Sequence, residues 1–123
     1  DPTLDVEGWD ATNKMVILAN SVLNTPTTLA DVSRTGITHL SEADLPMTML
    51  ATAEKTNSGY RLAVAPVRLP EDHPLATLDP LSMSAIFYTD LIGPMMITVN
   101  ERGPRPTAAA MLRDVIEIAD GSV

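Results

Sequence analysis

The stretch DVEGWDATNKMVILANSVL (residues 5–23) decides the fold, because a turn rich in charged groups leads directly into an apolar helix. Acidic residues precede the expected first helical residue, Trp9, where negative charge stabilises the positive end of the helix dipole. The interior, residues 15–19, is apolar on nearly every side, which predicts a helix covered on most of its faces. Proline at the end of residues 24–26 stops the helix, because it cannot continue the hydrogen-bond ladder.

The next part of the chain predicts a mixture of short elements. A polar helical turn is expected near residues 29–34 and a short strand at residues 36–40. The sequence Ser-Glu-Ala-Asp at 41–44 is typical of a helix cap, and it predicts a second helix that continues through residues 47–55. Residues 57–59, Asn-Ser-Gly, predict the turn that ends it.

The second half of the chain predicts a sheet. Residues 60–69 are rich in β-favouring side chains, and Pro66 places them at a sheet edge or a bulge. Residues 84–89 and 95–99 predict two more strands, which residues 90–94 join as a hairpin.

A last helix is expected at residues 108–119, with Thr107 as its N-cap and Gly121 beyond its end. Its apolar side chains repeat at helical spacing and predict one buried stripe, formed by Met111, Leu112, Val115, Ile116 and Ala119. Together the elements predict one α+β domain over residues 1–123, with a mixed or antiparallel sheet and helices packed on one face.

Composition excludes several classes of function. The net charge of −8 argues against binding to nucleic acid or to an anionic membrane, because phosphates would be repelled. The apolar stretches are too short to span a bilayer, and the start of the chain has no pattern typical of a signal peptide. The absence of cysteine is compatible with a cytoplasmic protein, and two histidines 34 positions apart predict no metal site.

Asp10 and Lys14 form the pair with the clearest chemical potential. Four positions apart on a helix, they share one face. They could be an ordinary surface ion pair, worth a few tenths of a kcal/mol. The spacing alone favours that interpretation. The pair could instead form an acid–base site, because a lysine beside a carboxylate can accept the proton of an alcohol during its oxidation. In that second interpretation, Asp5 could hold a substrate ammonium group by charge-assisted hydrogen bonds.

Residues 1–14 resemble the signature of homoserine dehydrogenases, Asp-Pro-x-x-Asp-Leu/Val-x-Gly-x-Asp-Ala-x-x-Lys, at every defined position. The resemblance continues in order along nearly the whole chain, at Gly36-Ile37, Asp44, Arg61-Leu62-Ala63, His73-Pro74-Leu75-Ala76, Thr89-Asp90-Leu91-Ile92-Gly93, Pro106-Thr107-Ala108-Ala109-Ala110 and Asp114. It implies the fold of the catalytic, substrate-binding domain of that family.

The resemblance also implies roles for individual residues. Lys14 matches the catalytic lysine that accepts the proton of the homoserine hydroxyl, and Asp10 matches the acid that orients it. Asp5 matches the acid that binds the substrate amino group. His73 matches a histidine near the active site, although without the resemblance it would be taken for an exposed loop residue.

Contact with the cofactor is where the sequence departs from the family. The glycine-rich loop that approaches the nicotinamide reads Val-Asn-Glu-Arg-Gly-Pro at residues 99–104, so only Gly103 remains for cofactor binding. The bulk of Glu101 and Arg102 would crowd a close backbone approach. Pro80 and Met83 replace a glycine and an asparagine expected after the His-Pro-Leu-Ala motif.

The dinucleotide-binding motif Gly-x-Gly-x-x-Gly does not occur in the sequence. We therefore expect NAD(P) to bind only when a nucleotide-binding domain is supplied, in cis or in trans, and the chain alone to be inactive. The resemblance further implies a homodimer. Two other functions remain open: a diverged member that acts on another amino or hydroxy acid, and a non-catalytic dimerising or regulatory module.

Overall fold

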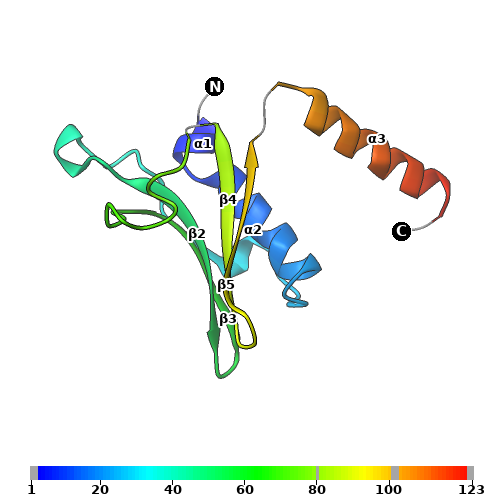
Figure 1. Cartoon of the computed structure of the whole chain (residues 1–123), viewed down its shortest axis with the longest axis horizontal. Helices are drawn as coiled ribbons and strands as arrows, with labels where there is room; N and C mark the ends of the chain where they lie inside the picture. The colour runs from blue at the N-terminus through cyan, green and yellow to red at the C-terminus, as the bar shows by residue number, and fades with distance from the viewer. Residues whose placement is uncertain (1–2, 80, 101–102, 122–123) are drawn as a thin grey trace. The chain divides into compact units, whose positions relative to one another are not determined.

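The computed structural model describes residues 3–79, 81–100 and 103–121 (Figure 1). The chain divides into two compact units, Asp1–Pro70 and Glu71–Val123. Helices and mixed or antiparallel strands make the fold α+β, as the sequence predicted.

The first unit contains a mixed sheet of three strands in the order β1-β3-β2. Strand β1 (Val32–Arg34) runs parallel to β3 (Gly59–Val67), and β2 (Thr48–Thr56) runs antiparallel to β3 along its whole length. Two residues, 57 and 58, form the tight turn that joins β2 to β3, where the sequence predicted a turn.

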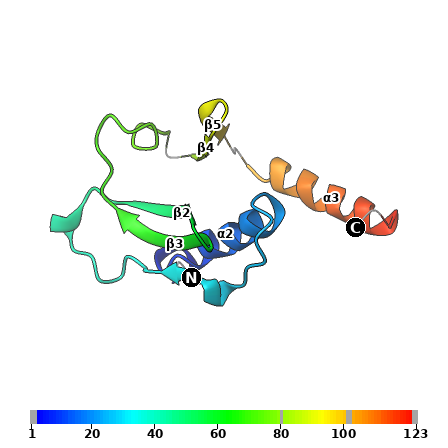
Figure 2. The same cartoon turned by 90° about the horizontal axis from the view of Figure 1, so that it is seen from below.

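Helix α2 (Trp9–Ser21) lies against the three-stranded sheet, as Figure 2 shows. Its buried side chains recur at helical spacing (Thr12, Met15, Ala19), and Val64 of β3 is fully buried beneath them. The expectation of a helix covered on most faces is wrong, because Ile17 remains 64% exposed. Only one side of α2 contributes to the core.

Two elements between α2 and β2 differ from the sequence prediction. The turn at residues 29–34 is a 3-10 helix, η1 (Leu29–Asp31), followed by β1. Residues 36–40 form a turn, not the expected strand. The ladder of β1 ends at Arg34, whose partner is Val64, so these residues follow the edge of the sheet without joining it.

The expected second helix is wrong. The cap at Ser41 exists, but it opens only the 3-10 helix η2 (Glu42–Asp44). Residues 47–55 have good helix formers, yet most of them belong to β2, which pairs with nine consecutive residues of β3. Pairing with a distant strand outweighs a local preference of a few tenths of a kcal/mol per residue.

Pro66 lies in β3, the central strand, and not in an edge strand. However, β1 pairs only with Leu62–Val64, so β3 has a neighbour on one side alone at Pro66, where Met49 of β2 is opposite. The proline therefore interrupts no ladder on the β1 side.

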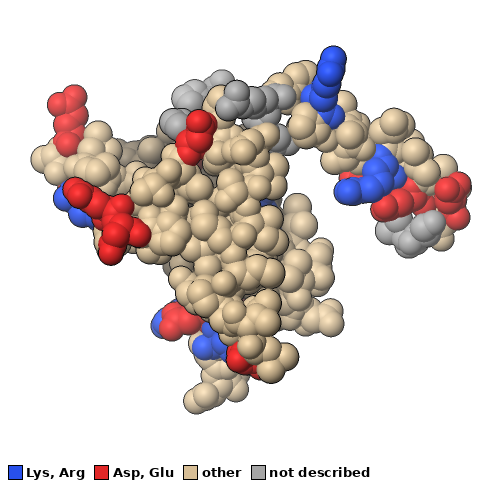
Figure 3. Space-filling view, viewed as in Figure 1, with Lys and Arg blue, Asp and Glu red and all other residues tan. Residues whose placement is uncertain are grey.

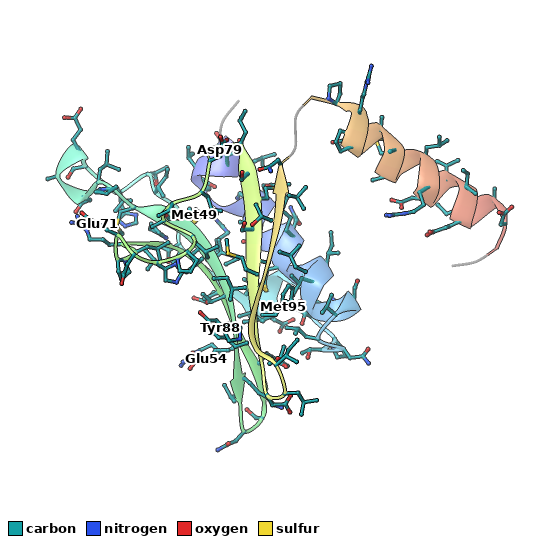
Figure 4. The ribbon with its side chains drawn as sticks, in the orientation of Figure 1. Met49, Glu54, Glu71, Asp79, Tyr88 and Met95 are labelled. Carbon is teal, nitrogen blue, oxygen red and sulfur yellow. The ribbon has the colours of Figure 1, made fainter. Side chains whose placement is uncertain are left out.

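The second unit contains a hairpin and a helix. Strands β4 (Ser82–Thr89) and β5 (Gly93–Asn100) pair antiparallel, as predicted, and Tyr88 and Met95, labelled in Figure 4, belong to opposite strands. One face carries the hydroxyls of Ser84 and Thr98, whose oxygens are 2.6 Å apart, beside the apolar pair Ile86 and Met96. The opposite face is apolar and is formed by Met83, Ala85, Phe87, Met95, Ile97 and Val99.

Helix α3 (Arg105–Ala119) begins three residues earlier than expected. Thr107 lies within its first turn and is not the N-cap; Pro104 holds that place, and Gly121 follows the end with φ +67°. The predicted buried stripe is exposed, with Val115 at 61%. In Figure 3 the charged side chains of α3 leave much of the visible surface of this helix uncharged. A stripe with helical spacing thus marks a face suited to burial, but no described residue of this unit covers it.

Candidate functional site

The turn between two helices carries the candidate site. The short helix α1 (Thr3–Val6) contains Asp5, and α2 begins at Trp9. Gly8, the N-cap of α2, has φ +76°, a conformation that glycine adopts without strain. The carbonyl of Gly8 accepts hydrogen bonds from the Thr12 amide at 3.0 Å and the Thr12 hydroxyl at 2.7 Å. Asp5 and the first turn of α2 therefore lie on either side of one tightly bonded glycine.

Asp10 and Lys14 form the ion pair that their spacing predicted. Lys14 Nζ lies 2.8 Å from Asp10 Oδ2 on the side of α2 away from the sheet core, and the two side chains are 60% and 52% exposed. Such an exposed pair contributes little to stability. The pair places an amine nitrogen beside a carboxylate on an exposed face of the helix.

A cluster around Trp9, which the sequence did not reveal, stabilises the same turn. The guanidinium carbon of Arg34 lies 3.7 Å from the centre of the Trp9 ring, and Arg34 Nη1 donates to the carbonyl of Glu7. Trp9 Nε1 in turn donates to Glu7 Oε2 at 3.1 Å. Arg34 lies 27 residues from Glu7 in sequence, so no local spacing signals the contact.

The sheet and the loop after β1 also contact this turn. Ile37 N donates to the carbonyl of Val6 at 2.8 Å. A Cβ at Gly8 would lie 3.3 Å from Val64 and 3.7 Å from the methyl of Met49, which is labelled on β2 in Figure 4. The sheet and the loop after β1 thus fix where the turn sits.

His73 and Gly103 belong to the second unit. His73 Nδ1 accepts a hydrogen bond from the Leu75 amide at 3.2 Å, so Nε2 is the ring nitrogen directed away from this local contact. Gly103 has φ +76°, and apart from its chain neighbours no atom of the described residues lies within 4 Å of the place where a Cβ would stand. Its conformation favours glycine, and the space beside it is open.

Some predicted positions lie outside the described residues, namely Asp1, Pro2, Pro80, Glu101 and Arg102. Within residues 3–79, 81–100 and 103–121, no three side chains of the metal-ligating types come together. In the same residues, no helix is both long and apolar enough to cross a membrane.

Comparison with known proteins defines the class to which this fold and turn belong. The family model described as homoserine dehydrogenase matches residues 1–116. The chain belongs to the homoserine dehydrogenase family.

Individual relatives agree with this assignment. Homoserine dehydrogenase of Corynebacterium glutamicum is 39% identical over 100% of this chain and 31% of its own length. The NAD(+)-dependent homoserine dehydrogenase of Pseudomonas canavaninivorans is 35% identical over 96% of this chain and 36% of its own. The crystal structure of S. aureus homoserine dehydrogenase at pH 6.5 matches with a TM-score of 0.83 and 27% identity, over 97% of this chain and 32% of that one. The chain spans about a third of the length of these relatives.

Proposed function

We propose that this chain is the substrate-binding and catalytic part of an enzyme that interconverts homoserine and aspartate semialdehyde. The observation that carries the proposal is the Lys14–Asp10 pair at 2.8 Å, with Asp5 on the other side of the Gly8 turn. These residues occupy the positions that the family signature defines, and the chain is a member of that family over residues 1–116.

Each group has one task in the proposed reaction. The carboxylate of Asp5 holds the substrate ammonium group by a charge-assisted hydrogen bond. When homoserine is oxidised, its hydroxyl proton passes to Lys14 Nζ while Asp10 keeps that nitrogen in place. His73 is proposed as a further residue of the site, because it stands at the histidine of the family's His-Pro-Leu motif. In the reverse direction Lys14 returns the proton to the forming alcohol.

When bound, NAD(P) would supply the hydride acceptor that oxidation of the hydroxyl-bearing carbon needs. Gly103, with open space beside it, allows a close backbone approach to the cofactor. The sequence has no glycine motif that could bind the phosphates of the dinucleotide. The nucleotide therefore requires a separate domain.

Helix α3 supports the proposal of a nucleotide-binding domain as a partner, in cis or in trans. Its apolar stripe is exposed along the helix, with Met111 and Val115 both above 60%. An amphipathic helix of 15 residues gains most of its stability from packing its apolar face, so a covering partner is expected. Homodimerisation through the apolar face of the β4–β5 hairpin is proposed for the same reason.

Lys14 tests the function, in an enzyme made by joining a nucleotide-binding domain upstream of this chain. Lys14→Ala should lower kcat by about 10²- to 10⁴-fold with little change in KM, because the lysine acts on a proton mainly in the transition state. Lys14→Arg should not restore kcat, since a guanidinium cannot accept the proton. Lys55→Ala, which removes the other lysine of the chain, is the control. Near-normal kcat in Lys14→Arg would show that lysine serves only as a positive charge.

A further inference from the structure

Arg34 occupies an unusual position for a charged residue. In β1 it stands two residues after the buried Val32, so it lies on the face of the sheet that α2 covers. Its Cγ is 3.6 Å from the place of a Cβ at Gly8, the N-cap of α2. The N-terminal end of a helix is positive and disfavours a cation. Other contacts must therefore stabilise the guanidinium there.

Those contacts all involve the turn of the candidate site. The guanidinium lies over the Trp9 ring at 3.7 Å and donates to the backbone carbonyl of Glu7. Among the ion pairs of the described residues none involves Arg34, so its charge faces a ring and a carbonyl instead of a carboxylate. Arg34, Trp9 and Glu7 form a closed set of three contacts, because Trp9 Nε1 also binds Glu7 Oε2.

The position of this turn determines the spacing of the site. Glu7 N donates to Thr3 O and Gly8 N to Asp5 O, which ends α1, while Gly8 O accepts the first bonds of α2. The two remaining carbonyls, those of Val6 and Glu7, accept from Ile37 N and Arg34. A rotation of the turn would move Asp5 relative to Asp10 and Lys14.

We propose that Arg34 is a positioning residue, which acts through Glu7 and Trp9 to fix the separation of Asp5 from the Asp10–Lys14 pair. This inference rests on the proposed function, in which Asp5 holds one end of homoserine and Lys14 acts at the other. A small substrate held at both ends makes the separation critical, because a misplacement of about 1 Å can cost 10²-fold in rate.

The contact itself is tested first, without activity, in the unmodified chain and its variants. Trp9 is the single tryptophan, so its emission reports directly on the stacked guanidinium. Arg34→Met should shift the Trp9 emission and accelerate amide exchange at Glu7 and Gly8, whose amides donate to Thr3 O and Asp5 O. The control Arg61→Met, an exposed arginine of the neighbouring strand paired with Glu54, should change neither. Unchanged emission in Arg34→Met would overturn the geometry.

The positioning role is tested by kinetics in the fused enzyme. Arg34→Met should lower kcat/KM for homoserine about 10- to 100-fold, with a higher KM and a lower kcat but an unchanged pH profile. Arg34→Lys keeps the charge over the ring and should recover part of the loss in kcat/KM. This variant also provides a test if Arg34→Met fails to fold. Trp9→Phe keeps the ring face but loses the bond to Glu7, and should fall between wild type and Arg34→Met.

Two outcomes separate this inference from the proposed function. If Arg34→Met has a lower Tm but wild-type kcat and KM, Arg34 is merely structural and the inference is wrong. If Lys14→Ala retains full activity in the same assay, the proposed function fails whatever Arg34 does. If Arg34→Met and Lys14→Ala both lose activity, while Arg61→Met stays within about twofold of wild type, the positioning role and the proposed function are both supported.

Discussion

A Cβ added to Gly36 would lie 2.8 Å from the Cα of Glu7 and 2.9 Å from the carbonyl oxygen of Val6. The loop after β1 and the turn before α2 therefore meet through their backbones, with no room for a side chain between them. Neither neighbour is the flexible end of a side chain, so a larger residue must push one chain segment away.

Gly36→Ala should consequently destabilise the first unit by about 1–3 kcal/mol, the usual cost of an overpacked interior. Denaturant unfolding followed by the fluorescence of Trp9 measures the change. Thr38→Ala, at an exposed position of the same loop, is the control and should lie within about 0.5 kcal/mol of wild type. A Gly36→Ala protein as stable as wild type would mean that the two segments separate easily.

Because of Asp31 and Asp44, the free energy of unfolding should decrease as the pH is lowered in the acidic range. Hydrogen bonds from the hydroxyl and amide of Thr28 lower the pKa of Asp31, and the amide and hydroxyl of Ser41 lower that of Asp44. A carboxylate whose pKa is lowered in the folded state favours folding above its unfolded pKa. That contribution disappears as the pH falls from about 5 through the folded value.

The double variant Asp31→Asn/Asp44→Asn should therefore lose stability at pH 7 but show a flatter dependence between about pH 5 and pH 2. Unfolding curves across that range provide the measurement, with Glu42→Gln in η2 as the control for removing one exposed negative charge. An unchanged slope in the double variant would contradict the prediction.

Asp5→Asn should raise KM for homoserine about 10- to 100-fold in the fused enzyme and leave kcat nearly unchanged. The reason is that the ammonium group is held equally in the ground and transition states, and a hydrogen bond to a charged group is worth about 1.5–3 kcal/mol. Homoserine acetylated on its amine lacks that charge, so wild type and variant should use it equally poorly. If wild type used the acetylated compound clearly better than the variant did, Asp5 would have a role other than binding the ammonium group.

The chain alone should show no NAD(P)-dependent oxidation of homoserine, because its residues cannot hold the dinucleotide. The absorbance of the reduced nicotinamide provides the assay, and the fused enzyme is the positive control. Turnover above background by the chain alone would refute the need for a second domain.

A dimer should form through the apolar face of β4 and β5, because exposed apolar surface of this kind favours self-association. Sedimentation at roughly tens of micromolar should show twice the mass of the chain. Ile97→Asp places a charge on that face and should give a monomer, whereas Thr98→Asp on the opposite face should not. A wild-type monomer would disprove the proposal, and a dimer unaffected by Ile97→Asp would assign the contact to another surface.

The features that depend on residues close together in the sequence were predicted correctly. Helix α2, the β4–β5 hairpin and the Asp10–Lys14 pair all arise from spacings of a few residues, and all are present. The helix expected at residues 47–55 failed because β3 determines that segment. Arg34 escaped notice because its contact with Glu7 depends on β1 lying beside β3, a long-range relationship that no local pattern encodes.

Pro66 bears on how this protein avoids unwanted assembly. Val64 O accepts from Thr35 N on the β1 side, so two residues later Pro66 faces the same, open edge of β3. A carbonyl of a foreign strand that approached there would find no N–H to donate a hydrogen bond to it, because proline has none. An exposed strand edge is a template for edge-to-edge aggregation, and a proline at this point is one of the ways proteins block it. The residue that seems least suited to a central strand thus protects a stretch of that strand, after Val64, that has no neighbour on the β1 side.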